Sequence, residues 1–342
     1  MIPKTLRRGV FLAPLVAALL SGCNTVVMNP TGDIAKQEAN LIIVSVILML
    51  LIIVPVFILI IWFARKYRAS NTEAAYEPDW DHSTKLELVI WGAPLLIIIV
   101  LGLVTWISTH KLDPYRPLDR LAEGRPIPAA TKPLVVQAVA LDWKWLFIYP
   151  EQGIATVNEL VVPVDVPVRF KISATSVMNA FYVPELAGMI YAMPGMETAL
   201  NAVQNKPVQS VGFSANYSGA GYSDMRFGYR GVPQGDFDAW VQSVKAAGGG
   251  KLDRANYLTL EKPSIKEPVR RYAGVDDDLY YRILNRCVTD GVVCQDKMMN
   301  DDAKKAREMA MVRYAPQQAA TTRLAQANGE VCTTPNDPVK KK

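Results

Sequence analysis

The sequence predicts a two-helix transmembrane hairpin, an all-β sandwich of Greek-key type and a C-terminal helical arm. Two runs without a charged residue, 41–63 and 88–109, can each form a helix that crosses ~30 Å of hydrocarbon. The stretch 134–247 contains many short apolar segments separated by glycine and proline, which is typical of a sandwich or a Greek-key barrel. The arm, 248–295, and a polar, partly disordered tail, 296–342, complete the chain.

The composition argues against nucleic-acid binding and against a metal site rich in histidine. A net charge of +5 on 342 residues is modest, and no long basic run is interleaved with aromatic residues. The chain has two histidines, His82 and His110, and both flank the apolar runs. The β-rich part therefore has no imidazole for a blue-copper site or for a Ser/His/Asp triad.

Residues 1–22 are typical of a bacterial secretory signal. A basic start that includes Lys4 precedes the apolar stretch 10–20. The segment ends in Leu-Ser-Gly-Cys, which resembles a lipobox, so we expect Cys23 to become the lipid-modified N-terminus. An uncleaved anchor with an incidental cysteine is the alternative. One acyl chain is not a stable anchor by itself, so it would supplement the spanning helices.

Helices at about 41–63 and 86–109 form the predicted hairpin, within the segment 23–112. Basic residues that begin at Arg65 follow the first helix, so the positive-inside rule places the connecting loop in the cytoplasm. Both ends of the hairpin then face the periplasm, the side on which a lipobox cysteine must lie. A proline-rich linker, 113–133, should extend along the surface to a periplasmic β domain.

Within the β domain, the segments 160–163 and 168–172 predict a hairpin that turns near Asp165. Further strands are expected near 135–140, 180–184, 197–203, 208–213 and 223–228. Residues 234–247 predict a helix with Asp236 as its N-cap. One face of that helix carries Phe237, Trp240, Val241 and Val244.

A loop late in the β domain has the spacing of a metal site without the side chains for one. The positions concerned are Asn179, Ser214, Asn216, Ser218, Tyr222 and Met225. A soft copper centre needs thiolates and imidazoles, whereas hydroxyls stay protonated near neutral pH and an amide is a weak donor. Since Met225 alone cannot hold copper, we expect no metal here.

This spacing resembles subunit II of the haem-copper terminal oxidases. In the cytochrome c oxidase members, the positions matching the two serines carry cysteines, and those matching Asn179 and Tyr222 carry histidines. Together with a methionine matching Met225, they build the binuclear CuA centre. The surrounding motifs are kept here: Val-Pro-Glu-Leu at 183–186, Pro-Gly-Met at 194–196 and Met-Arg-Phe at 225–227. This combination is similar to subunit 2 of the cytochrome bo-type quinol oxidases, over about residues 23–295.

The resemblance implies a cupredoxin-like fold and no cofactor bound by this chain. Haems and copper would belong to a partner subunit I, with subunits III and IV and membrane lipid as further partners. The complex would be a proton-pumping terminal oxidase of the bacterial inner membrane that reduces oxygen with ubiquinol. This chain would have no catalytic residue of its own. The alternatives are a stand-alone membrane-anchored lipoprotein with a vestigial cupredoxin fold and a cytochrome c-type electron carrier with unusual ligands.

The motif His82-x3-Leu86-Glu87-x3-Trp91-x2-Pro94 resembles the start of the second helix in this family. There the matching glutamate lies at the cytoplasmic mouth of the K proton pathway into subunit I. An interfacial carboxylate can exchange protons with water and is rarely kept without function. A glutamate in a first helical turn also stabilises the helix by ~0.3–1 kcal/mol. The residues alone favour this second role for Glu87, and the resemblance favours the proton entrance.

Two aromatic groups also have counterparts in the family. The segment Asp-Trp-Lys-Trp, 142–145, matches an aromatic pair that lies beside copper in the cytochrome c oxidases, but here we expect the tryptophans to pack inside the sandwich. The arm resembles that of quinol-oxidase subunits at 260–264 and 278–284. Because Tyr280 and Tyr281 are expected to have little core of their own, the arm should clasp a partner.

The C-terminal region contains three of the four cysteines. Cys287 and Cys294 are close in the sequence and lie in an oxidising compartment, which predicts a disulfide. Zinc is the less favoured alternative, because no histidine is near. Cys332 is left over in the tail. Residues 300–325 predict a polar helix, and the composition after Gly329 is typical of disorder.

Overall fold

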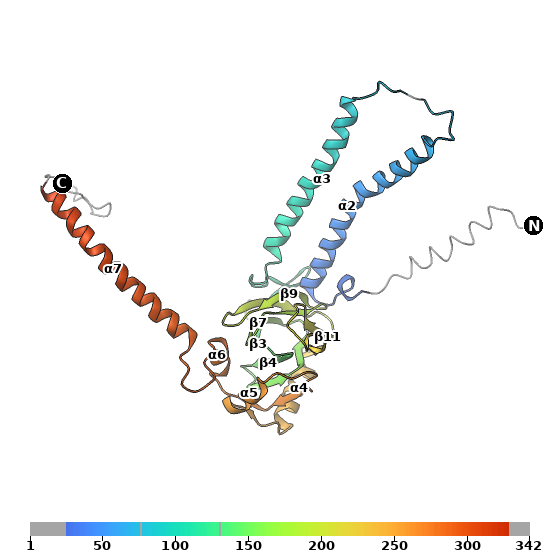
Figure 1. Cartoon of the computed structure of the whole chain (residues 1–342). Coiled ribbons are helices and arrows are strands. Elements are labelled where there is room, and N and C mark those ends of the chain that lie inside the picture. Colours follow the sequence, from blue (N-terminus) through green and yellow to red (C-terminus); the bar gives the residue numbers. More distant parts are fainter. Residues whose placement is uncertain (1–24, 76, 130, 328–342) are drawn as a thin grey trace, which may run out of the picture.

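The computed structural model describes residues 25–75, 77–129 and 131–327, with side chains as far as residue 311. Two long helices rise from one end of a β sandwich, and shorter helices cover the opposite end (Figure 1). This arrangement confirms the predicted fold class. The expected signal segment, the lipid-modified Cys23 and the unpaired Cys332 lie outside the described residues.

The hairpin consists of α2 (Asp33–Lys66) and α3 (Thr84–Lys111), and both helices are longer than predicted. Each contains an apolar run long enough to cross a membrane. The additional turns are polar, so a search for uncharged runs could not find them. The first turns of α2 pack on the β domain, where Ala35 and Ala39 are buried. A short 3-10 helix, η1 (Val26–Met28), precedes α2.

The start of α2 is fastened to the linker after α3 by a buried carboxylate, and to the β domain by a backbone hydrogen bond. Asp33 is only 4% exposed and accepts hydrogen bonds from Arg120 Nε at 3.0 Å and Nη2 at 3.3 Å. The backbone N–H of Gly32 donates to Glu185 O at 2.8 Å. A Cβ on Gly32 would lie 2.6 Å from the carbonyl oxygen of Leu186, so this close approach requires glycine. The hairpin therefore leaves the domain at a fixed point.

Two sheets form the sandwich. The first contains, in spatial order, β10 (Thr198–Val203), β7 (Pro167–Ala174), β3 (Leu134–Leu141), β4 (Lys144–Tyr149), β5 (Ile154–Val157) and β14 (Arg270–Tyr272). The second contains β6 (Glu159–Pro163), β12 (Arg226–Val232), β11 (Val208–Ser214), β8 (Asn179–Val183) and β9 (Ala187–Ala192). The pairs β3–β7 and β6–β12 are parallel, and the remaining pairs in both sheets are antiparallel.

The predicted hairpin of 160–163 and 168–172 is wrong. β6 pairs with β12 in the second sheet, whereas β7 pairs with β3 and β10 in the first. The chain crosses between the sheets at Asp165, whose φ is 57°. A turn signal between two apolar segments does not tell a hairpin from a crossover. The strand expected at 223–228 also begins later, because η2 (Tyr222–Asp224) precedes β12.

An aromatic cluster fills the space between the sheets. Trp145, Phe147, Phe181 and Phe227 are almost fully buried, with ring centroids 4.9–6.4 Å apart. Aromatic pairs in tilted or edge-to-face geometry stabilise by about 0.5–1.5 kcal/mol each beyond the area they bury. Trp145 is thus in the core as predicted. Trp143 packs against the edge of this core: its backbone has a φ of 64°, and its ring is partly buried.

Helix α4 (Gln234–Ala246) covers one end of the sandwich (Figure 1). The four residues predicted to share its apolar face, Phe237, Trp240, Val241 and Val244, are all buried in the main core. The predicted N-cap is wrong, since the cap position is Pro233 and Asp236 lies in the first turn. An acidic residue there still interacts favourably with the helix dipole.

The arm folds onto its own sandwich. It comprises β13 (Lys251–Leu252), α5 (Arg254–Leu260), β14, β15 (Gly274–Val275) and α6 (Leu279–Leu284). A second core forms where Tyr257 and Tyr280 pack with Leu146 and Ile148 of the first sheet. Tyr280 is only 7% exposed, so the expectation that it lacks a core of its own is wrong. Tyr281, at 41% exposed, does face outward.

A buried lysine ties the arm to the sandwich. Lys144, at the start of β4, is 1% exposed, and its Nζ donates to Lys262 O at 2.7 Å and to Ser264 Oγ at 2.6 Å. Desolvation lowers the pKa of Lys144, against the opposing charge of Glu267. A second tie is Glu159 of β6, which accepts from Arg271 of β14 at 2.8 Å.

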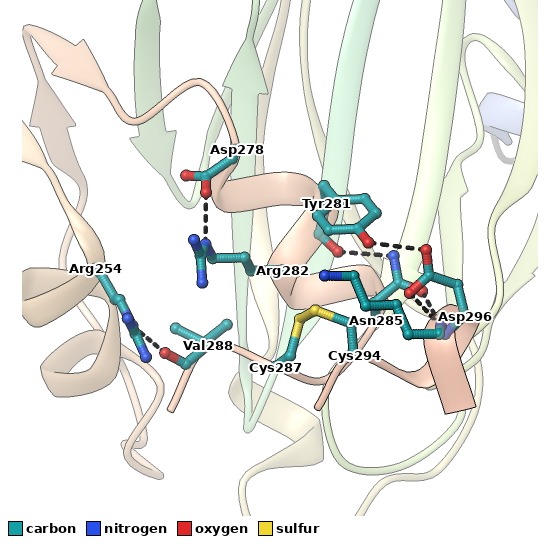
Figure 2. Close-up of a disulfide and its surroundings, with 10 residues drawn as sticks. Arg254, Asp278, Tyr281, Arg282, Asn285, Cys287, Val288, Cys294 and Asp296 are labelled. Carbon is teal, nitrogen blue, oxygen red and sulfur yellow. Dashed lines mark hydrogen bonds and ion pairs between the residues drawn. A yellow bond between two sulfur atoms is a disulfide. The ribbon is translucent and has the colours of Figure 1, made fainter. Parts of the chain in front are cut away.

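The C-terminal helix α7 (Gln295–Ala327) contains the predicted polar helix and projects from the sandwich (Figure 1). Figure 2 shows the disulfide between Cys287 and Cys294 that precedes it. Tyr281 Oη donates to Asp296 at 2.8 Å, and the backbone N–H of Gln295 donates to Asn285 O at 2.9 Å. These contacts hold the first turn of α7 against α6.

The small β1 (Arg120–Ala122) and β2 (Arg125–Pro126) form a hairpin within the expected linker. Arg125 of this hairpin pairs with Asp165 at 2.9 Å through two hydrogen bonds. Arg125 therefore attaches the linker to the domain surface. Arg120, in the other strand of the same hairpin, attaches it to Asp33 of α2.

Replacing Lys144 by methionine should loosen the arm. We expect Lys144→Met to lower the free energy of unfolding by about 1–3 kcal/mol, because two partly buried acceptors lose a charged donor. Thermal unfolding of the purified protein, followed by tryptophan fluorescence, measures this change. Lys245→Met on the exposed side of α4 is the matched control, and an equal midpoint for both variants would refute the role of Lys144.

Removing the disulfide should destabilise the junction between α6 and α7. For so short a loop we expect Cys287→Ser combined with Cys294→Ser to cost roughly 2–3 kcal/mol. The measurement is limited proteolysis, with cleavage between residues 285 and 300 expected to become much faster. Cys332→Ser serves as the control. Unchanged cleavage in the double variant would show that the hydrogen bonds at Tyr281 and Asn285 suffice.

Candidate functional site

The structure brings the six residues of the metal-like spacing together at one end of the sandwich. Asn179 begins β8 and Ser214 ends β11, which are neighbouring strands. A loop then leads through Asn216 and Ser218 to η2, where Tyr222 lies, and Met225 follows directly. The six residues therefore lie together, although their side chains are not the types that hold copper. Met225, Asn179 and Ser214 are each at most 2% exposed.

The buried polar groups of this loop satisfy one another. Ser214 Oγ donates to Asn179 Oδ1 at 3.0 Å and accepts from the backbone N–H of Ala180 at 3.3 Å. Asn179 Nδ2 donates to Val177 O at 3.1 Å. Asn216 Nδ2 donates to Met178 O at 3.1 Å. A polar network whose members are all paired is rigid, because breaking any contact would leave a buried group without a partner.

Trp143 closes the loop from the side. Its Nε1 donates to Ser218 O at 3.0 Å, and a Cβ on Gly221 would lie 2.5 Å from its ring. The ring therefore rests directly on the glycine backbone. Within the described residues, the Ser218 hydroxyl makes one weak contact, with Met225 Sδ at 3.9 Å. Trp143, which was expected to pack inside the sandwich, thus also packs against this loop.

These donors do not fit a soft copper ion. The described part of the chain contains no cluster of three or more histidine, cysteine, aspartate or glutamate side chains that could hold a metal. At the loop itself the donors are two hydroxyls, a phenol, amides and one thioether, none of which provides the thiolate or imidazole that copper centres use. The oxygen of Asn179 is also occupied by the Ser214 hydroxyl.

A second candidate group lies at the opposite end of the molecule, at the start of α3. Glu87 Oε1 is 2.7 Å from His82 Nδ1, and the two side chains are 49% and 60% exposed. His82 Nε2 lies 3.1 Å from Thr84 Oγ1. The backbone N–H of Glu87 donates to Ser83 O, as in a regular first turn. The structure thus brings together the two residues of the motif that can carry a proton.

A third group, which no sequence motif indicates, lies where the hairpin meets the β domain. A cavity of about 230 Å³ lies there, between the start of α2, the chain after α3 and strand β9. Its wall includes Glu38, whose Oε1 accepts from the backbone N–H of Gly188 at 3.1 Å. The sequence contains only a weak sign of this cavity: the acidic residues Asp33 and Glu38 precede the apolar run 41–63.

Comparison with known families identifies two regions of the chain. Residues 136–232 match the periplasmic domain of cytochrome c oxidase subunit II. Residues 246–291 match a motif described as the COX aromatic-rich motif. The first region is the sandwich, and the second is the arm with its buried tyrosines.

Curated relatives match over most of the chain. Cytochrome bo(3) ubiquinol oxidase subunit 2 of Pseudomonas putida is 50% identical over 268 residues, which cover 78% of this chain and 82% of the relative. The Pseudomonas aeruginosa protein of the same name is 48% identical, covering 80% of each chain. Ubiquinol oxidase subunit 2 of Acetobacter aceti is 46% identical, covering 82% and 89%. The chain therefore belongs to the quinol oxidase subunit 2 family and is a subunit of a ubiquinol oxidase complex.

Proposed function

We propose that this chain is the architectural subunit of its oxidase, and that electrons pass from quinol to the partner subunit I without crossing the β domain. The observation that carries this proposal is the closed hydrogen-bond network from Asn179 through Ser214 to the loop backbone. Such a network supports the sandwich and presents no copper ligands. Haems and copper would then reside in subunit I.

We infer that Glu87 delivers protons from the cytoplasm to subunit I. A half-exposed carboxylate at a helix start can exchange protons with water. The imidazole ring of its neighbour His82 can both accept and donate a proton, and its Nδ1 lies 2.7 Å from Glu87 Oε1, so it can pass protons to Glu87. A role in capping alone would not need the histidine in contact with the carboxylate.

The remaining elements suit a membrane-embedded subunit. Both long helices expose apolar side chains along their length, which supports contact with subunit I and with lipid. Lipid modification of Cys23 would add a second attachment on the periplasmic side. Subunits III and IV complete the complex in this proposal, in the bacterial inner membrane, with ubiquinol as the reductant.

Removing the carboxylate should slow turnover. We expect Glu87→Gln to lower ubiquinol oxidation by at least about tenfold, because positioned proton-transfer groups commonly contribute a factor of 10² or more and water can replace a half-exposed one in part. Oxygen consumption by the purified complex measures this rate.

The matched control is Glu77→Gln, an exposed carboxylate in the same cytoplasmic loop. It should turn over like the unaltered complex. Assembly is monitored separately by haem content. Full turnover of an assembled Glu87→Gln complex would leave that residue a helix-end role only.

The copper content of the periplasmic region tests the first proposal. We expect metal analysis of a soluble fragment spanning residues 113–295 to find no stoichiometric copper, even after incubation with copper salts, because its loop presents hydroxyls and amides. Reduced soluble cytochrome c should likewise fail to reduce the intact complex. Copper bound one or two per fragment, or rapid reduction, would contradict an architectural role.

A further inference from the structure

The cavity beside α2 lies at the level of the lipid headgroups on the periplasmic side. Glu38 stands one turn before the uncharged run 41–63, and Lys111 follows the uncharged run of α3 directly. Near the end of α3, Trp106 exposes 68% of its surface, as rings in the interfacial aromatic belt do. The cavity therefore faces the boundary between hydrocarbon and water.

Most charges around the cavity neutralise each other within the protein. Arg120 pairs with Asp33, and Arg116 pairs with Asp119 at 2.8 Å. Three charged side chains on its wall have no opposite charge within 4.0 Å among the described residues: Glu38, Lys111 and Asp113. The two carboxylates accept only backbone N–H groups, from Gly188 and Tyr115.

A groove between α2 and α3 adjoins the cavity. Its exposed surface is mostly apolar, although its wall also includes the polar side chains of Ser108 and His110. It has a volume of about 540 Å³, and its wall includes Leu41, Thr105 and Thr109. The residues that line both the cavity and the groove are Glu38, Leu112, Asp113 and Pro114. Thr105 and Thr109 donate their hydroxyl protons to Leu101 O and Thr105 O, at 2.8 and 2.9 Å. Their hydrogen-bonding needs are met, so the groove can accept an acyl chain.

We propose that this cavity binds the headgroup of a phospholipid that carries a primary ammonium, as phosphatidylethanolamine does. The ammonium lies between Glu38 and Asp113, the phosphate lies beside Lys111, and one acyl chain occupies the groove between α2 and α3. An ammonium donates hydrogen bonds to carboxylates and is more favourable there than in bulk water at the low dielectric of the interface. An anionic headgroup without an amine would meet two carboxylates and one ammonium.

The charges on the wall distinguish this ligand from a helix of a partner subunit. Two carboxylates and one ammonium without an ionic partner in the described part of the chain match a headgroup that carries both a primary ammonium and a phosphate. An apolar helix turn placed there would leave all three charges without a partner. The proposal is independent of the proton role of Glu87, which lies at the other end of α3.

The test uses the whole oxidase complex, purified in a mild detergent and equilibrated with an equal mixture of phosphatidylethanolamine and phosphatidylglycerol. Native mass spectrometry then counts the lipids retained. We expect the unaltered complex to retain phosphatidylethanolamine preferentially. Glu38→Gln should weaken that retention about tenfold, the effect of losing a hydrogen bond to one charged group. Lys111→Gln should do the same.

Glu38→Gln keeps an oxygen that can accept from Gly188, so the junction should stay folded. Glu123→Gln, an exposed carboxylate in the turn between β1 and β2, is the matched control and should retain lipid normally. Haem content and turnover report assembly. If the Glu38→Gln complex fails to assemble, lipid retention by the Lys111→Gln complex tests the proposal. The Lys111 side chain is exposed, so its replacement should leave the fold intact.

Three results would overturn the proposal. The first is equal retention of the two lipids by the unaltered complex. The second is unchanged retention in an assembled Glu38→Gln or Lys111→Gln complex. The third concerns a photoreactive amino acid at Met189, which lines the cavity. A cross-link from that position to another subunit, with no lipid adduct, would show that a protein segment occupies the cavity.

Discussion

A buried ion pair joins the start of the first long helix to the linker that leads into the sandwich. Asp33 is the first residue of a spanning helix, and it is almost fully buried against Arg120. Breaking such a pair leaves an uncompensated buried charge, which is strongly destabilising. Close contact of Gly32 with the backbone around Leu186 adds a steric constraint on the same segment. Together they set the height and direction of the β domain relative to the hairpin.

The loop with the spacing of a copper site is held together by hydrogen bonds between short polar side chains and the backbone. Backbone N–H and C=O groups in a buried loop still need partners. Asn179 and Ser214 supply them with short polar side chains, and Trp143 fills the adjacent space. Apolar replacements at these positions would have left those groups unpaired. The observed residues therefore explain how hydrogen bonds keep this loop in shape.

The arm packs on the outer face of the first sheet, and this packing accounts for its apolar residues. Every residue of β4 is buried, because the aromatic core covers one face and the arm covers the other. A strand buried on both faces needs a second layer, and α5 and α6 provide it through Tyr257 and Tyr280. Lys144, in the same strand, binds the loop that follows α5. The arm is thus part of the domain, and its outward residue Tyr281 holds α7 in place.

Composition and spacing along the chain were enough to predict the two-helix hairpin, the all-β domain and the lack of thiolate and imidazole side chains at the loop. Each of these features is local in the sequence. The three-dimensional fold was needed to show that β6 and β7 lie in different sheets, that Tyr280 is buried, and that Lys144 binds residues 262 and 264. The same holds for the cavity beside Glu38. These features arise from contacts between segments far apart in the chain, and alternating apolar residues do not specify which distant surface will cover them.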